Sequence, residues 1–316
     1  MYFWKSLLET YNQDYPKTGR IKWASGWQSA VLYIVIMWSP VTQAEANSVS
    51  DYTIAGLPMH NYRWENNFKN ATMTKLHCAG TVGFIFTPKG RIDPERRWVW
   101  IGNIYCAFPW DQRNWNIFQQ WYIEKFLDAG FHVVGIDVGV TAGSPAGAEV
   151  FQKFYEMLIR DYKLNPKARL TAQSNGGLIV YGWAFRYPNE VDRILGILPA
   201  TDMRSWPGLN QLCPPGDIVT KGLSYGLSCE ELQNRLREFN PIDNLAPLAK
   251  AGVKIYHIHG DTDAIVPIKE NTIEFQKRYQ ALGGEMEVEL IPGGNHGEPE
   301  KSFFESREAL KFLLVD

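Results

Sequence analysis

The chain has 316 residues, of which 45% are hydrophobic and 21% charged, a composition that supports a large buried core and excludes an intrinsically disordered protein. A formal net charge of -2 and an isoelectric point near 6.3 give no basic surface that could neutralise a phosphate backbone, so nucleic acid is not an expected partner. We expect one large domain preceded by a leader.

The N-terminal segment has the order of a secretory signal. Basic residues precede an apolar run at residues 30–38, and the small residues Ala44 and Ala46 follow it. The run is shorter than the about 20 apolar residues that span a membrane, so we expect no stable membrane insertion after cleavage. We expect residues 1–46 to be a signal peptide with an extended N-region and residues 47–316 to form a secreted or periplasmic domain. The alternatives are a retained anchor and a natively packed helix.

From about residue 75 the chain alternates between short β-rich apolar runs and longer amphipathic stretches. This alternation predicts an α/β fold in which a mostly parallel central sheet is flanked by helices on both faces. Gly130 and Pro188 end two of the helices. The expected strands are residues 96–103, 132–138, 168–173, 193–200, 253–260 and 286–293, and the expected helices are residues 114–130, 148–162, 175–187 and 270–284.

Residues 202–245 interrupt this alternation. The segment contains Pro207, Pro214, Pro215 and several glycines, and no regular period is visible in it. Long segments of this kind in compact domains are often functional. We expect an insertion that forms a small lid over the carboxyl edge of the sheet, the alternative being a surface loop.

The stretch AQSNGG places Ser174 between an expected strand and an expected helix. A serine hydroxyl is a weak nucleophile at neutral pH, so it needs a general base in hydrogen-bond reach and an exposed position on a tight turn. Ala172 and Gly176 are small where the nucleophile elbow G-x-S-x-G has glycines. We therefore expect Ser174 to be a nucleophile, although a serine at this position is by itself more often a helix N-cap.

An oxyanion hole is expected beside this serine. The N-terminus of a helix offers free N–H groups and a dipole that favour developing negative charge. The backbone N–H of Asn175 is the first expected donor. The second is expected from the loop after the strand at residues 96–103, from Ile104 or Tyr105.

Candidate partners for the serine follow two later strands. Asp263 comes after the strand at residues 253–260, and His296 comes after the strand at residues 286–293. An imidazole can take the serine proton, and a carboxylate can hold the imidazole in the required tautomer. The chain order Ser174, Asp263, His296 is the order that accompanies a nucleophile elbow. We expect these three residues to form a catalytic triad.

The elbow AQSNGG, the acid loop HGDTDAIVP and the histidine loop PGGNHG resemble the three signature loops of the α/β-hydrolase superfamily, and the resemblance covers nearly all of residues 75–316. The D-x-x-V-P spacing resembles that of esterases and prolyl-oligopeptidase-like enzymes, which implies Asp263 rather than Asp261 as the acid. More narrowly, SNGGLIVYGWA, DMRSWPG and NPIDNLAPLAKAGV resemble uncharacterised, mostly secreted bacterial members grouped with carbohydrate-degrading enzymes. The resemblance implies the α/β-hydrolase fold and hydrolysis of carboxylic esters through an acyl-enzyme, with an O-acyl carbohydrate as the favoured substrate.

Three other functions compete with this interpretation. Oligopeptidases of this type commonly carry a propeller or a large N-terminal domain, for which the stretch between Ala46 and the expected core is too short. A dehydrogenase would need a G-x-G-x-x-G run that opens a helix, and the sequence has none, so no cofactor is expected. A non-catalytic binding protein with the same fold stays open as an alternative.

Further residues are candidates for substrate binding or for competing roles. Trp206 and Trp110 are candidate walls of a substrate cleft, and Asp137 is either a substrate ligand or a loop cap. Among the other histidines, we expect His257 and His259 to lie on opposite faces of a buried strand, with at least one of them in the core.

The sequence has four cysteines and no metal site is expected from their spacing. Cys213 and Cys229 are close enough in sequence to staple a local loop, which would leave Cys78 and Cys106. Four buried free thiols are the alternative. The sequence predicts neither the cysteine pairing nor the oligomeric state.

Overall fold

The structure is a computed structural model, and its described part begins with two short strands. β1 (Thr53–Ile54) pairs antiparallel with β2 (Leu57–Pro58). The expected leader lies outside the described residues, so its cleavage stays a prediction. After the two strands the structure describes residues 68–103, 117–138, 141–209, 225–296 and 301–315.

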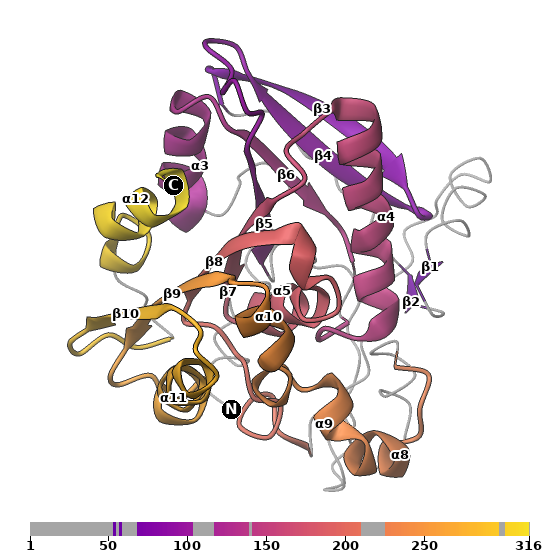
Figure 1. Ribbon diagram of the computed structural model, residues 1–316, viewed down its shortest axis with the longest axis vertical. Coiled ribbons are helices and arrows are strands. Elements are labelled where there is room, and N and C mark those ends of the chain that lie inside the picture. The colour runs from indigo at the N-terminus through magenta and orange to yellow at the C-terminus, as the bar shows by residue number, and fades with distance from the viewer. Residues whose placement is uncertain are drawn as a thin grey trace, which may run out of the picture. The chain divides into compact units, whose positions relative to one another are not determined.

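The described strands after residue 68 form an 8-stranded sheet with the order β10-β9-β8-β7-β5-β6-β4-β3 (Figure 1). Neighbours from β10 to β6 run parallel, whereas β4 is antiparallel to both β6 and β3. The expected mostly parallel sheet is therefore confirmed, and an antiparallel pair extends it. The strands are β3 (Ala71–Cys78), β4 (Thr81–Pro88), β5 (Trp98–Asn103), β6 (His132–Ile136), β7 (Ala168–Gln173), β8 (Val191–Ile197), β9 (Lys254–Gly260) and β10 (Met286–Ile291).

Helices cover both faces of this sheet, as expected from the sequence (Figure 1). α4 shows how the sequence sets a boundary, because Ser144 accepts a hydrogen bond from the N–H of Gly147 and Pro145 starts the first turn. One face carries α3 (Ile117–Asp128) and α12 (Arg307–Leu314), and the other carries α4 (Pro145–Tyr162), α5 (Gly176–Ala184), α10 (Ala246–Lys250) and α11 (Glu274–Ala281).

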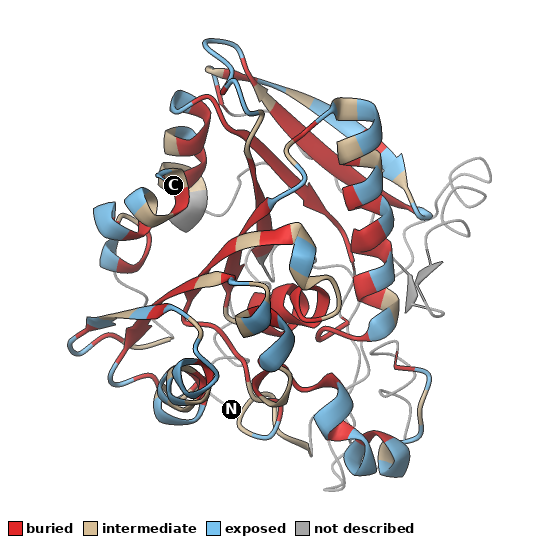
Figure 2. Cartoon of the chain, viewed as in Figure 1, coloured by how far each residue is buried: buried red, intermediate tan, exposed pale blue. Residues whose placement is uncertain are grey.

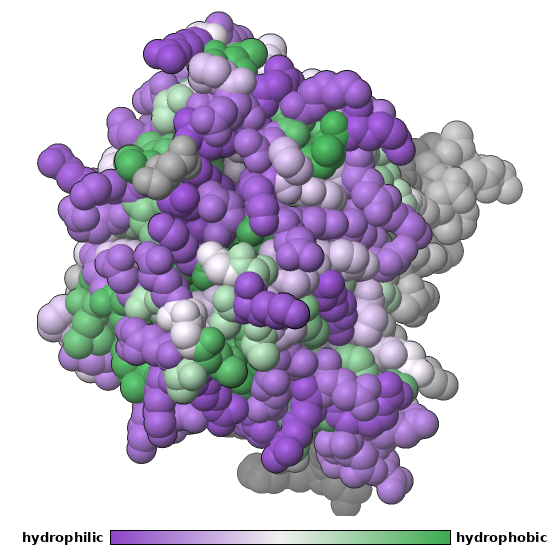
Figure 3. Space-filling model, in the orientation of Figure 1, coloured by the Kyte–Doolittle hydropathy of each residue, from purple (hydrophilic) through white to green (hydrophobic). Residues whose placement is uncertain are grey.

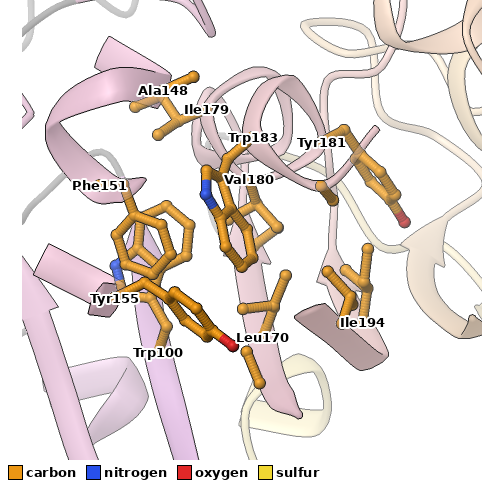
Figure 4. Packing of buried hydrophobic residues seen from close by; sticks show 14 of the residues in the cluster. Trp100, Ala148, Phe151, Tyr155, Leu170, Ile179, Val180, Tyr181, Trp183 and Ile194 are labelled. Atoms are coloured by element: carbon orange, nitrogen blue, oxygen red, sulfur yellow. The ribbon is translucent and has the colours of Figure 1, made fainter. Parts of the chain in front are cut away.

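The alternation of side chains along the strands separates two hydrophobic cores. In β5, Trp98 and Trp100 join the core under α4 and α5, whereas Val99 and Ile101 join the core under α3 and α12. Strands and inward helix faces are largely buried, as Figure 2 shows. In Figure 4 the Trp100 ring lies against the ring of Phe151, with a centroid separation of 3.4 Å.

A third hydrophobic cluster lies in the segment that follows β8. Its buried members include Met203, Tyr225 and Phe239, and it also contains Val266 of the acid loop. The sequence pattern showed no regular element here, yet the described part has short helices, which are too brief to produce a visible period. A capping box, in which Ser228 and Glu231 bond each other's backbone N–H groups, was the missed signal. The elements are α8 (Cys229–Asn234), α9 (Leu236–Phe239) and the 3-10 turn η3 (Pro241–Asp243).

Whether residues 202–245 act as a lid stays a prediction, because residues 210–224 lie outside the described part.

The face of the molecule shown in Figure 3 is mostly hydrophilic, with hydrophobic side chains in scattered groups. In the described part of the chain, no helix has the length and hydrophobicity of a membrane span. Among the residues whose burial is described, the exposed large hydrophobic ones are Ile92, Ile273, Leu282, Leu290 and Val315.

Candidate active site

Ser174 occupies a sharp turn between β7 and α5. Its φ angle of 52° lies in the left-handed region, which is unfavourable for a residue with a side chain. Hydrogen bonds hold its backbone in place: its N–H donates to the carbonyl of Ile197, and its carbonyl accepts from the N–H groups of Gly177 and Ala200. A non-glycine residue kept at positive φ by its surroundings is a frequent feature of active sites.

The turn is tight enough that side chains around it must be small. Ala172 is buried in β7 between Gly102 of β5 and Gly196 of β8, its partners in the sheet. A Cβ atom at Gly177 would lie 2.3 Å from the carbonyl oxygen of Ala200. The sequence places small residues where the strand-to-helix turn needs them.

Replacing Gly177 with alanine is expected to lower the free energy of unfolding by about 2 kcal/mol, because the added methyl group overlaps the backbone of Ala200, whose N–H is hydrogen-bonded to the carbonyl of Ser174. Gly90→Ala is the matched control, since a Cβ atom there meets nothing within 4 Å. Chemical denaturation of both variants measures the difference. Equal stability of the two would contradict the tight packing of the turn.

A chain of hydrogen bonds joins the three residues of the expected triad. The Oγ atom of Ser174 lies 2.8 Å from Nε2 of His296, and Nδ1 of His296 lies 2.7 Å from Oδ2 of Asp263. An ionised carboxylate only accepts hydrogen bonds, so Nδ1 carries the proton and Nε2 accepts from the serine hydroxyl. This is the tautomer that a general base for Ser174 requires.

The carboxylate of Asp263 is fully buried and surrounded by donors. Oδ1 accepts hydrogen bonds from the backbone N–H groups of Ile265 (3.0 Å) and Val266 (2.8 Å), while Oδ2 faces the rings of His296 and His259. Burial by itself raises the pKa of Asp263, but the hydrogen bonds from the two histidines and the N–H of Val266 outweigh it and hold the pKa below its ordinary value. Asp263 therefore stays ionised at neutral pH.

The acid loop and the histidine loop are bonded directly to each other. Asp261 accepts a hydrogen bond from the N–H of Gly293 (2.7 Å), and the hydroxyl of Thr262 donates to the carbonyls of Gly293 and Gly294. The structure thus gives Asp261 and Asp263 different tasks, with Asp263 on the histidine ring and Asp261 on the backbone of the histidine loop. These bonds set the separation of Asp263 and His296.

The expected oxyanion donors are only partly described. Asn175 is buried, follows Ser174 directly and precedes the first turn of α5, where backbone N–H groups have no partner within the helix. Ile104 and Tyr105 lie outside the described residues, so the second donor stays a prediction.

The expected substrate contacts have different positions. Trp206 is partly exposed in the turn after β8 and packs against the third hydrophobic cluster, which also includes Val266. Asp137 is buried directly after β6, and its backbone bonds Thr81 and Val82 of β4. Trp110 lies outside the described residues. The hydrogen bonds described above that join Ser174, His296 and Asp263 do not include Trp206 or Asp137.

The expectation that His257 and His259 lie on opposite faces of their strand was wrong, because residues two positions apart in a strand share a face. Both rings are fully buried and both contact the hydroxyl of Thr272. Sequence reasoning therefore missed the contact of His259 with Asp263 and the part that Thr272 has in it. The H-x-H spacing directly before the acid loop was the available signal.

The structure describes two of the cysteines as either a free thiol or part of a disulfide. Cys229 is disulfide-bonded, so four free thiols are excluded, and Cys78 is a free thiol on β3. Cys106 and Cys213 lie outside the described residues.

No family model and no curated protein matches the sequence. Solved structures do match it. A truncated carbohydrate esterase from gut microbiota superposes with a TM-score of 0.55 and 18% identity over 81% of this chain and 96% of that one. Carboxyl esterase 2 from the fungus Tuber melanosporum gives a TM-score of 0.54 and 17% identity over 87% and 95% of the two chains.

Peptidases match as well. Dipeptidyl peptidase 4 of Porphyromonas gingivalis superposes with a TM-score of 0.59 and 14% identity over 78% of this chain, which spans 35% of the peptidase. Identities this low establish the fold alone. The sheet order, the helices on both faces and these structural matches together show that the chain has the α/β-hydrolase fold.

Proposed function

We propose that the protein is a serine hydrolase that cleaves carboxylic esters through an acyl-enzyme on Ser174. One observation carries the proposal: a serine held at positive φ is hydrogen-bonded to His296, which is hydrogen-bonded to a buried, ionised Asp263. Each of these side chains has the hydrogen-bond partner that acyl transfer requires.

In the first half of the reaction, Oγ of Ser174 attacks the ester carbonyl as its proton passes to Nε2 of His296. The tetrahedral intermediate then collapses, the ester C–O bond breaks, and the alkoxide leaves as an alcohol with the proton from Nε2. Asp263 keeps Nδ1 protonated and stabilises the imidazolium that forms in between. The N–H of Asn175 is proposed to donate to the oxyanion.

In the second half, water takes the place of the alcohol. Nε2 of His296 accepts a proton from water as its oxygen attacks the acyl carbonyl, and returns the proton to Oγ of Ser174 as the acid is released. Activity is expected to fall in acid, because an imidazole that has already gained a proton cannot accept one from the serine.

Esters are proposed because two of the structural neighbours are esterases, which align with this chain over 96% and 95% of their own length. An O-acylated carbohydrate is the proposed natural substrate, since one of these neighbours is a carbohydrate esterase and the sequence resembles members grouped with carbohydrate-degrading enzymes. The site is proposed to act in a secreted or periplasmic protein without a cofactor.

Covalent labelling tests the proposal whatever the natural ester is. A fluorophosphonate probe added to the full chain is expected to modify Ser174 alone, which peptide mass spectrometry can locate, and heat-unfolded protein is expected to remain unlabelled. Labelled wild type that hydrolyses 4-nitrophenyl acetate and acetylated xylan but no peptide amide would support an esterase. Cleavage of peptide amides in preference to esters would favour a peptidase, and absence of labelling would favour a binding protein.

A further inference from the structure

A line of buried polar side chains, each in contact with the next, leads to Asp263, the member of the proposed triad that does not bond Ser174 directly. It starts at Tyr181 of α5, whose ring points away from the Trp100, Phe151 and Trp183 rings in Figure 4. Tyr181 Oη lies 2.7 Å from Nε2 of His257, and Nδ1 of His257 lies 3.0 Å from Oγ1 of Thr272.

The line continues from Thr272 to the acid. Oγ1 of Thr272 lies 2.8 Å from Nδ1 of His259, and Nε2 of His259 lies 3.3 Å from Oδ2 of Asp263. The same Nε2 lies 2.9 Å from the carbonyl oxygen of Val266. Tyr181, His257, Thr272 and His259 are completely buried, so each of their polar atoms depends on these partners.

The partners fix where each proton is. Val266 O and the carboxylate of Asp263 can only accept, so Nε2 of His259 carries a hydrogen. Nδ1 of His259 then accepts from the hydroxyl of Thr272, which in turn accepts from Nδ1–H of His257. Nε2 of His257 is left to accept from the hydroxyl of Tyr181.

The reverse direction would turn the O–H of Tyr181 away from His257, the partner that its hydroxyl has within the described part of the chain. Burial also raises the pKa of Tyr181 and lowers that of His257, which keeps both groups neutral. The described hydrogen bonds therefore run in one direction, toward Asp263.

Two backbone features make room for this line. Residues Lys269–Ile273 form a π-helical turn, closed by a 2.9 Å bond from the N–H of Ile273 to the carbonyl of Ile268, and this turn directs Thr272 to both histidines. π-turns cost helical regularity and are frequent at functional sites. On β8, Gly196 leaves space for the ring of His257, because a Cβ atom there would lie 2.6 Å from its Cδ2.

His259 contacts the acid loop at two points at once. Its Nε2–H is hydrogen-bonded to the carbonyl of Val266 at 2.9 Å, and the same nitrogen lies 3.3 Å from Oδ2 of Asp263. The N–H of Val266 in turn donates to the other carboxylate oxygen of Asp263. The ring thus ties the backbone of the loop to the carboxylate that the loop presents.

We propose that His259 is a positioning residue: its Nε2–H, set by Thr272, keeps the Asp263 carboxylate turned toward His296. The proposal rests on the proposed function of the triad. It assigns His259 no proton transfer and no contact with substrate. Loss of this donor should weaken the hydrogen bond between Asp263 and the His296 ring and leave the substrate site unchanged.

Two variants of His259 test the proposal in the full chain. His259→Leu removes both ring nitrogens. We expect kcat for 4-nitrophenyl acetate to fall about tenfold, which corresponds to the free energy of one typical hydrogen bond. KM is expected to stay nearly unchanged. His259→Gln keeps an N–H close to the position of Nε2 and is expected to recover most of kcat. A His259→Leu variant with the kcat of the wild type would overturn the proposal.

His257→Leu is the matched control, because His257 is equally buried on the same face of the same strand but does not contact Asp263. Thr272 can still donate to His259 in this variant, so we expect a loss of stability with kcat within about twofold of the wild type. If His257→Leu lowers kcat as much as His259→Leu does, the effect comes from core packing and positioning through Asp263 is wrong.

Proton NMR separates this proposal from the proposed function. The Nδ1–H of His296, bonded to a carboxylate, should give a low-field signal that is absent in His296→Ala. We expect that signal to move or broaden in His259→Leu and to stay in place in His257→Leu, whether or not the protein hydrolyses the chosen ester. An unchanged signal in His259→Leu would overturn the positioning role even in a protein without esterase activity.

Discussion

Ser174→Ala is expected to lower kcat for ester hydrolysis by about six orders of magnitude, as removal of a triad nucleophile does elsewhere. The variant keeps His296 and Asp263 but loses the oxygen that bonds to the acyl group. Initial rates with 4-nitrophenyl acetate and burst-phase measurements check the result. A variant within tenfold of the wild type would assign the chemistry to another group.

The same position separates chemistry from stability. Alanine has the same difficulty as serine at a φ of 52°, whereas glycine does not. Ser174→Gly should therefore be as inactive as Ser174→Ala but more stable by about 1 kcal/mol. Denaturant titration of the two inactive variants measures the strain that the turn holds, without interference from turnover.

Asp263→Asn is expected to lower kcat by about 10⁴-fold through a change of tautomer. The N–H groups of Ile265 and Val266 both point at Oδ1, so the amide oxygen of asparagine must take that position. The NH₂ group then takes the position of Oδ2 and faces Nδ1 of His296. Nδ1 becomes an acceptor, Nε2 carries the hydrogen, and the ring can no longer accept the proton of Ser174. Steady-state kinetics at neutral pH provide the measurement.

Asp261→Asn is the control for this substitution. Asp261 accepts one hydrogen bond from the N–H of Gly293, and an amide oxygen can accept it equally well. We expect Asp261→Asn to keep kcat within about threefold of the wild type, since the loop separation is retained. Similar losses in the two variants would show that charge in the acid loop, rather than the tautomer of His296, controls the rate.

Much of this architecture could be predicted from local sequence patterns. The strands from β5 to β10 are short β-rich runs bounded by turns, and each expected site residue of the triad closely follows one of them. Because the carboxyl ends of parallel strands share an edge, chain order alone indicated that Ser174, Asp263 and His296 could meet. The structure brings these three side chains into hydrogen-bond contact.

The local sequence of other elements contains too little information to predict them. α12 has eight residues, and arginines of two neighbouring strands donate to its carbonyls: Arg169 to that of Leu313 and Arg193 to that of Phe312. β3 and β4 pair with each other across a two-residue turn at Ala79 and Gly80, where no N-G or D-G turn marks a hairpin. Thr272 could not be identified because its role depends on a π-turn, which moves a side chain off the regular helical period.

Ser174 and the histidine loop follow strands that differ in their number of neighbours in the sheet. Ser174 follows β7, which has a hydrogen-bonded strand on each side, whereas the histidine loop follows β10, an edge strand of the described sheet. Edges of a sheet open at a lower free-energy cost than its interior. Thermal fluctuations should therefore detach the proposed base, His296, long before they disturb the proposed nucleophile, Ser174, so that the proposed triad is lost by a local opening while the remainder of the molecule is still native.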